Sequence, residues 1–101
     1  MEMAKQFPSQ NMLSKDMPSD VWHLYVLQCA DGTYYTGVTT DVKRRLNEHN
    51  TSNRGAKYTK TRRPVKLVYS SEYDSRSSAQ KAEHRFKRLT RKQKESMINE
   101  R

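Results

Sequence analysis

The sequence predicts an α+β domain in which a three-stranded antiparallel sheet is flanked by helices, in the order β-β-α-β-α-α. Two observations lead to this prediction. Residues 22–49 combine two short strand-like runs, separated by a strong turn signal, with a helical pattern. Residues 65–100 contain a third alternating run, followed by two helical patterns that each start with a capping signal.

The composition allows one small folded domain. The chain has 101 residues, of which 33% are hydrophobic. Residues 1–20 contain two prolines and no sustained period, so we expect a flexible leader there and a single domain over residues 21–101. Cys29 is the only cysteine, which excludes a disulfide within the chain and favours a reducing compartment. We therefore expect an intracellular protein, in the cytoplasm or in a nucleus, without a membrane partner.

The predicted hairpin begins with the run WHLYVLQ over residues 22–28. Asp31-Gly32 is the strongest short turn signal in the chain, and the run YYTGV follows it. Alternation along a strand places Tyr25 on one face with Leu27, and Tyr35 on one face with Gly37. A glycine inside a strand, such as Gly37, indicates a bulge or a place where another backbone or a ligand comes close.

The first helix is predicted over about residues 41–50, after the N-cap cluster Thr-Thr-Asp. Val42, Leu46 and His49 follow helical spacing and mark one face of this helix, and Arg45 borders that face. Residues 51–63 read as a polar, basic loop around Gly55.

Pro64 opens a third predicted strand that ends near residue 73. Ser77 and Gln80 have capping-box spacing and predict the start of a second helix over residues 78–89. The core stripe of this helix consists of Ala79, Ala82, Phe86 and Leu89, with Glu83 beside it. Thr90 and Gln93 repeat the capping spacing and predict a last helix over residues 91–100.

The charge indicates a polyanionic partner. Twenty Lys and Arg against eleven Asp and Glu give a net charge of +9 and a pI near 9.9, which favours nucleic acid first and an anionic membrane surface second. Nine of the basic residues lie between residues 43 and 66, together with one acid. The side chains that we expect to contact nucleic acid are Lys43, Arg44, Lys57, Tyr58, Lys60, Arg62 and Arg63.

The candidate reactive residues suit phosphodiester hydrolysis. Arg45 can offer a planar fork to a phosphate, and Tyr25, Tyr35 and His49 can organise an attacking water. A tyrosine with an ordinary pKa near 10 is a poor base at neutral pH, whereas a histidine near 6.5 is a simpler one. The choice of base between Tyr25 and His49 stays open at this point. The acids are scattered, which argues against a two-metal site, and Glu83 is the exception because it borders an apolar helical stripe.

Residues 22–95 resemble the GIY-YIG nuclease family, most closely its small single-domain, UPF0213-like members. The first signature tripeptide stands as HLY, ending at Tyr25, and the second as YTG, ending at Gly37. Arg45 follows eight residues later, His49 one helical turn after that, and the likeness continues through GAKYT and PVKLVYS to Glu83. The tripeptides depart from the name-giving letters at positions 23 and 36, as small members commonly do.

The resemblance implies this same α+β fold and a metal-dependent endonuclease that hydrolyses DNA, with selectivity for structured DNA in repair or recombination. It implies that a tyrosine acts as base or orienter, that Arg45 binds the phosphate, and that Glu83 is the single protein ligand of Mg²⁺ or Mn²⁺. Such an ion keeps several waters and binds weakly without substrate. The alternative is a basic DNA- or RNA-binding module that keeps the fold without turnover.

Overall fold

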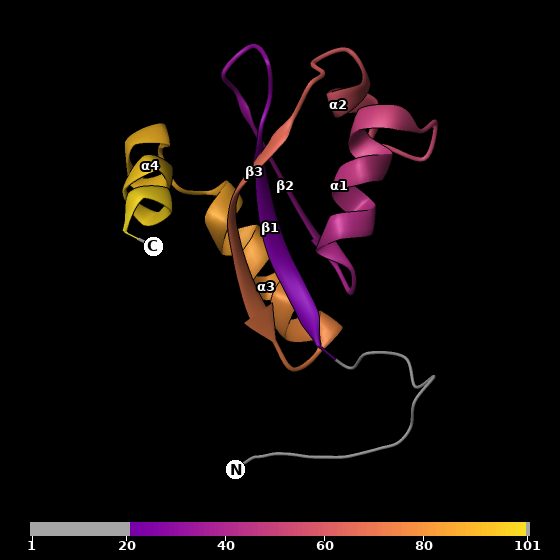
Figure 1. Cartoon of the computed structure of the whole chain (residues 1–101). Coiled ribbons are helices and arrows are strands. Elements are labelled where there is room, and N and C mark those ends of the chain that lie inside the picture. Colours follow the sequence, from indigo (N-terminus) through magenta and orange to yellow (C-terminus); the bar gives the residue numbers. More distant parts are fainter. Residues whose placement is uncertain (1–20, 101) are drawn as a thin grey trace, which may run out of the picture.

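A computed structural model describes residues 21–100, and the expected leader lies outside this range. The elements are β1 (Trp22–Gln28), β2 (Tyr34–Thr39), α1 (Val42–Thr51), α2 (Lys57–Lys60), β3 (Lys66–Tyr73), α3 (Arg76–Lys87) and α4 (Arg91–Asn99). The predicted fold class is confirmed: the strands form one three-stranded antiparallel sheet with helices on both sides (Figure 1).

The sheet has the order β2-β1-β3, so that the first strand is central. This position explains the run of four buried residues from Leu24 to Leu27, since a central strand is covered on both faces. The predicted turn joins β1 to β2. Gly32 adopts a φ of 86°, which favours glycine, and the Asp31 carboxylate accepts hydrogen bonds from the backbone and hydroxyl of Thr33.

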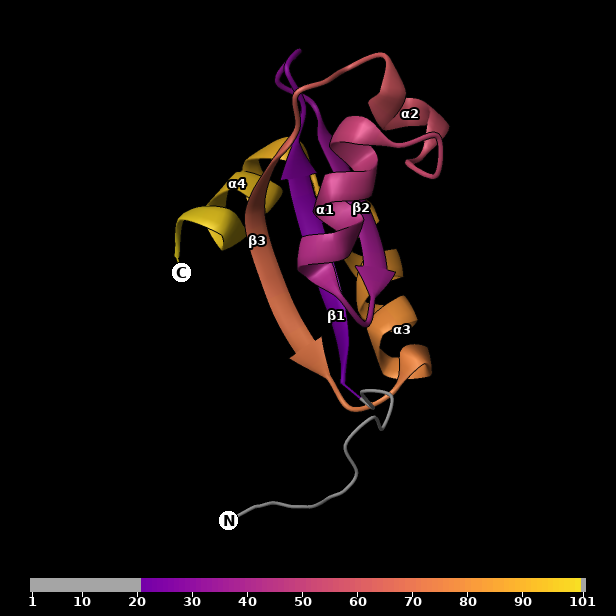
Figure 2. The same cartoon turned by 45° about the vertical axis from the view of Figure 1, so that its right-hand side comes forward.

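The two faces of the sheet carry separate hydrophobic clusters. On one face, Tyr25 and Leu27 pack with Val42 and Leu46 of α1. On the other face, the cluster consists of Leu24, Val26, Ala82 and Phe86, and Met97 and Ile98 of α4 pack against it. Figures 1 and 2 show α1 and α3 on opposite sides of the sheet. A site that uses both helices must therefore lie around a sheet edge.

Two local predictions differ from the structure. The second predicted helix starts earlier than residue 78, because the side chain of Ser75, rather than Ser77, caps it by accepting the Ser78 N–H at 3.0 Å. The region predicted as a loop over residues 51–63 contains the single-turn helix α2, which is too short to show a period in the sequence. The capping box of Thr90 and Gln93 is confirmed.

No helix within residues 21–100 combines the length and the apolar character that a membrane span requires.

Candidate active site

The predicted site residues come from both sides of the sheet. Tyr25 lies on β1, Tyr35 on β2, and Arg45 and His49 on consecutive turns of α1. The rings of Tyr25, Tyr35 and His49 form a cluster. The Tyr35 ring centroid lies 5.0 Å from that of His49 and 6.5 Å from that of Tyr25. Glu83 lies on α3, across the sheet, and α3 contacts β2. The structure therefore brings Tyr25, Tyr35 and His49 together beside Arg45, and it places Glu83 on the helix that contacts β2 from the other face of the sheet.

Gly37 allows the Tyr25 ring to lie across β2. These two residues are register partners on the paired strands. A Cβ atom at position 37 would stand 2.6 Å from the Tyr25 hydroxyl and 2.8 Å from its Cζ atom. The predicted close approach at Gly37 is thus made by a tyrosine side chain, and a side chain at this position would push the Tyr25 hydroxyl away from its partners.

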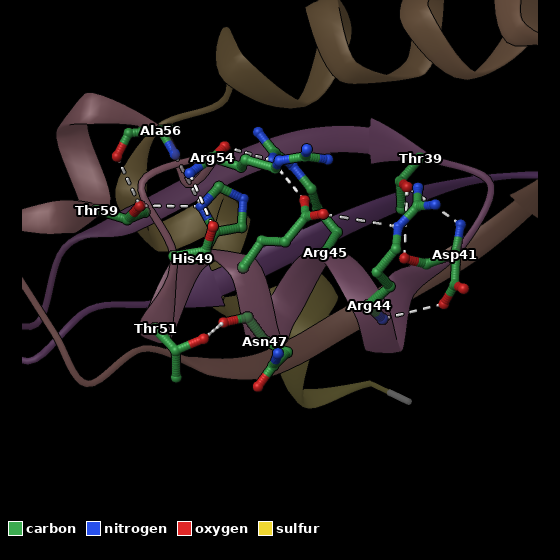
Figure 3. Close-up of polar contacts among 12 residues, drawn as sticks. Thr39, Asp41, Arg44, Arg45, Asn47, His49, Thr51, Arg54, Ala56 and Thr59 are labelled. Carbon is green, nitrogen blue, oxygen red and sulfur yellow. Dashed lines mark hydrogen bonds and ion pairs between the residues drawn. The ribbon is translucent and has the colours of Figure 1, made fainter.

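A chain of buried hydrogen bonds starts at the Tyr25 hydroxyl. This hydroxyl lies 2.8 Å from Nε2 of His49, whose Nδ1 lies 2.9 Å from Oγ1 of Thr59. The Thr59 hydroxyl lies 2.9 Å from the carbonyl oxygen of Ala56 (Figure 3). His49 and Thr59 have no exposed surface, and Tyr25 is 2% exposed.

The contacts at Nδ1 are compatible with two tautomers of His49. A carbonyl oxygen only accepts, so the Thr59 hydroxyl donates its proton to Ala56 and its oxygen can accept from His49 Nδ1–H at 2.9 Å. The Ala56 N–H, 3.3 Å from the same Nδ1, can only donate and favours a lone pair on that nitrogen. Nε2 can accept the Tyr25 hydroxyl proton in the tautomer that carries its proton on Nδ1.

Gly55 lets the loop before α2 come close to His49. A Cβ atom at position 55 would stand 2.7 Å from the Glu48 carbonyl oxygen and 2.9 Å from the His49 Cα atom. Only glycine lets the loop touch the α1 backbone so closely. The next residue, Ala56, is the N-cap of α2, and three residues later the Thr59 hydroxyl contacts the imidazole.

Burial keeps both candidate bases neutral. It raises the pKa of Tyr25 to about 12, against the opposing influence of the Arg45 guanidinium. Burial, and then the Arg45 charge, lowers the pKa of His49 to about 4. At neutral pH neither group therefore carries a charge in the protein alone.

Arg45 lies at the exposed edge of the ring cluster, where two hydrogen bonds hold it in place. Its Nη1 donates to Glu48 Oε1 at 2.9 Å and to the Arg54 carbonyl oxygen at 2.8 Å (Figure 3). Its side chain is 26% exposed. The guanidinium thus stands beside the Tyr25 hydroxyl and reaches the surface, where a phosphate could meet it.

Glu83 is the acid that α3 contributes. Its negative charge is the smallest of the influences that raise the pKa of Tyr25, after burial and the Tyr35 phenol. Its Oε2 atom lies 3.1 Å from Nζ of Lys87, and its side chain is 21% exposed. Within residues 21–100 no group of three His, Cys, Asp or Glu residues could hold a metal ion. An ion at Glu83 would therefore have fewer than three ligands of these types among the described residues.

The residues predicted to contact nucleic acid fall into two groups. One group is exposed and consists of Lys43, Arg44, Lys57, Tyr58 and Lys60. The other group makes internal contacts. Arg62 binds the Asp31 carboxylate at 3.0 Å, and Arg63 donates to the carbonyl oxygens of His49 and Ser52 at the end of α1. Contact of either group with nucleic acid stays a prediction.

Thr59 is the polar neighbour that sequence reasoning did not single out. It belongs to the stretch GAKYT, which read as part of a solvated loop. A threonine in such a stretch carries no signal of burial, and only the return of α2 onto His49 places it in the site.

Acidification is expected to destabilise the protein through His49. The pKa of this imidazole is about 4 in the folded protein and near 6.5 in an unfolded chain, so only the unfolded state binds the proton between these values. The free energy of unfolding should therefore fall as the pH drops from about 6.5 toward 4. Denaturant unfolding at about pH 7 and pH 5 measures this decrease in the free energy of unfolding. The decrease should be smaller in the His49→Gln variant.

His84 provides the matched control, because it is a histidine on the exposed surface of α3. His84→Gln should keep the pH dependence of the natural sequence. An unchanged pH dependence in His49→Gln would contradict the assignment to His49.

Comparison with known proteins identifies the family of this domain. The model of the GIY-YIG catalytic domain matches residues 21–96. A UPF0213 protein of Streptococcus agalactiae is 56% identical over 78 residues, which cover 77% of this chain and 88% of that protein. A UPF0213 protein of Halobacterium salinarum is 55% identical over 76 residues, which cover 75% of this chain and 97% of that protein.

Two solved structures are similar to this one. The solution structure of an E. faecalis protein has a TM-score of 0.55 at 49% identity, and that of a UPF0213 protein from Bacillus halodurans has 0.51 at 42%. Each comparison covers 78% of this chain and 83% of the other. The family model spans the whole sheet and both helices that carry the clustered side chains, and the chain therefore belongs to the GIY-YIG nuclease family.

Proposed function

We propose that the protein is a metal-dependent endonuclease that hydrolyses phosphodiester bonds in DNA. The observation that supports this most strongly is the direct hydrogen bond between the Tyr25 hydroxyl and His49. The charges of Arg45 and Glu83 both act on the pKa of this hydroxyl. A protein that only binds DNA needs positive charge but not a buried proton acceptor behind a phenol.

In this proposal Tyr25 and His49 act as one base. Both nitrogens of His49 contact protein atoms, so the attacking water meets Tyr25 instead. In the tautomer of His49 with its proton on Nδ1, the water gives a proton to the Tyr25 oxygen, and the phenolic proton moves to the free Nε2 of His49. The resulting hydroxide forms a bond to phosphorus, and the bond from phosphorus to the leaving oxygen breaks. The negative phosphate offsets the Arg45 charge and so favours the imidazolium that forms.

The residues present fit one hard divalent ion. A single carboxylate, at Glu83, suits Mg²⁺ or Mn²⁺, which keep several waters and take substrate oxygens as further ligands. The exposed ion pair with Lys87 is weak and is easily displaced. When bound, the ion supplies positive charge that stabilises the leaving oxygen. Arg45 holds the phosphate from the opposite side, where its guanidinium neutralises charge that develops on the phosphoryl oxygens.

The test is cleavage of a panel of labelled DNAs, namely single strands, duplexes, flaps and branched junctions, with Mg²⁺, Mn²⁺ or EDTA. We expect cutting with either ion and none with EDTA, because the leaving oxygen requires the ion's charge. Preference for flaps or junctions would support a role in repair or recombination. Absence of cutting on every DNA, with binding intact, would contradict the proposal.

The second candidate is a DNA- or RNA-binding module that keeps the fold without turnover. The ion pair of Glu83 with Lys87 is one observation in its favour, because an acid that only pairs with a lysine needs no metal ion. The low pKa of His49, about 4, is another, since an imidazole with that pKa is a weak base. Such a module would bind nucleic acid equally well in EDTA and would show no metal-dependent product.

A further inference from the structure

A surface pocket of about 260 Å³ adjoins the clustered side chains. Its walls come from β2, α2, α3 and α4, and consist of Tyr34, Tyr35, Thr36, Tyr58, Lys87 and Lys94. Three of the six are tyrosines and two are lysines. Aromatic rings next to cations are the combination with which proteins hold unpaired nucleotides, the rings stacking on bases and the cations attracting phosphates.

Tyr58 is the most exposed ring of this pocket and is held rigidly. Tyr58 is 38% exposed as a residue, and the Arg62 guanidinium covers one face of its ring, 3.8 Å from the centroid, so a base would use the part of the ring that Arg62 leaves open. Its hydroxyl donates to Thr33 Oγ1 at 2.8 Å, while Arg62 is fixed in turn by Asp31 at 3.0 Å. A ring that is already immobilised loses little entropy when a ligand stacks on it.

The pocket shares side chains with the proposed reaction centre. The Tyr35 ring lies 5.0 Å from the His49 ring and 6.1 Å from the Tyr58 ring, at an angle of 24° to the latter. Lys87 contacts both the pocket and Glu83. A nucleotide whose phosphate lies at Arg45 and Tyr25 would therefore have its own base, or the base beside it, within reach of the pocket.

The charges around the pocket suit a nucleotide. No acidic side chain is among its six lining residues. Arg91 lies 4.6 Å from the Tyr34 ring centroid and pairs with Glu95 at 3.0 Å, so the positive charge of the pocket comes from its two lysines. The pocket thus offers rings and positive charge together, close to the place where the phosphate of the cut strand would lie.

We infer that this pocket receives an unpaired base of the DNA strand that is cut, and that the substrate is single-stranded DNA or a single-stranded part of a branched DNA. A base inside a duplex is stacked on both faces and enters such a pocket only after it is flipped out, which costs energy. This inference rests on the proposed function, since it names the substrate of the same site.

The test measures binding and needs no cleavage. Glu83→Gln protein, with and without a second change, is titrated in EDTA with a short labelled single strand and with the duplex of the same sequence, and anisotropy gives the affinities. Adding Tyr58→Ala should lower the affinity for the single strand about 10-fold, as expected for loss of one stacked base, and leave the duplex affinity unchanged. Adding Tyr58→Phe, which keeps the ring, should preserve both affinities.

Equal effects of Tyr58→Ala on both DNAs, or no effect on either, would overturn the inference, and so would tighter binding of the matching RNA strand. This outcome can be distinguished from failure of the proposed function. If the protein cuts DNA but Tyr58→Ala has no selective effect on the single strand, the nuclease proposal stands and the pocket assignment is wrong. If Tyr58→Ala has the selective effect but the protein cuts no DNA, the pocket assignment stands and the nuclease proposal is wrong.

Discussion

Glu83→Gln is expected to lower the rate of DNA cleavage by about 100-fold or more and to leave DNA binding in EDTA intact. A bound metal ion contributes several kcal/mol of transition-state stabilisation, and the amide replaces its only proposed protein ligand by a neutral group of the same size. The measurement is a single-turnover cleavage rate with Mg²⁺, beside a binding titration without metal. Because the change removes a negative charge, affinity for DNA should stay constant or rise slightly.

Glu72→Gln is the matched control. Glu72 is exposed on β3, so its change removes the same charge away from the site. It should leave the cleavage rate unchanged. If both variants cut at the rate of the natural protein, Glu83 is not the metal ligand. If both lose activity equally, the effect belongs to net charge rather than to coordination.

The sequence predicted those features of the candidate site that depend on spacing within one helix or one strand. Arg45 and His49 are one helical turn apart, and alternation along a strand placed Tyr25 on one face with Leu27, the face that α1 covers in the structure. These relations follow from the periods of a helix and a strand, so they are readable without a structure. The same periods predicted the apolar faces of α1 and α3, which hold the two helices on opposite sides of the sheet.

The sequence did not predict contacts that depend on how the loops return. Thr59 reaches His49 only because Gly55 lets the chain touch the α1 backbone, and neither residue type signals this. Arg63 read as a basic loop residue, yet its guanidinium caps the last carbonyls of α1. The position of Glu83 near Tyr25 came from the family resemblance, because the two residues are far apart in the chain and on opposite layers.

Tyr25→Phe is expected to lower the cleavage rate by about 10²- to 10⁴-fold, the usual contribution of a general base. The change removes only the hydroxyl that lies 2.8 Å from His49 Nε2. It also leaves that nitrogen without its partner in a buried place, at a cost in stability of about 1–3 kcal/mol. Denaturant unfolding therefore accompanies the rate measurement. Tyr73→Phe is the control, since its hydroxyl contacts Ser71 at the other side of the molecule.

The double variant decides between the two bases left open by the sequence. If Tyr25 passes its proton to His49, the two residues act as one unit, and Tyr25→Phe with His49→Gln should cut no more slowly than the worse single variant. If His49 alone activated the water, Tyr25→Phe would keep most of the rate while His49→Gln lost it. Independent roles would make the losses multiply. The direct bond between the two side chains, together with the Thr59 contact that orients the imidazole, leads us to expect the non-additive result.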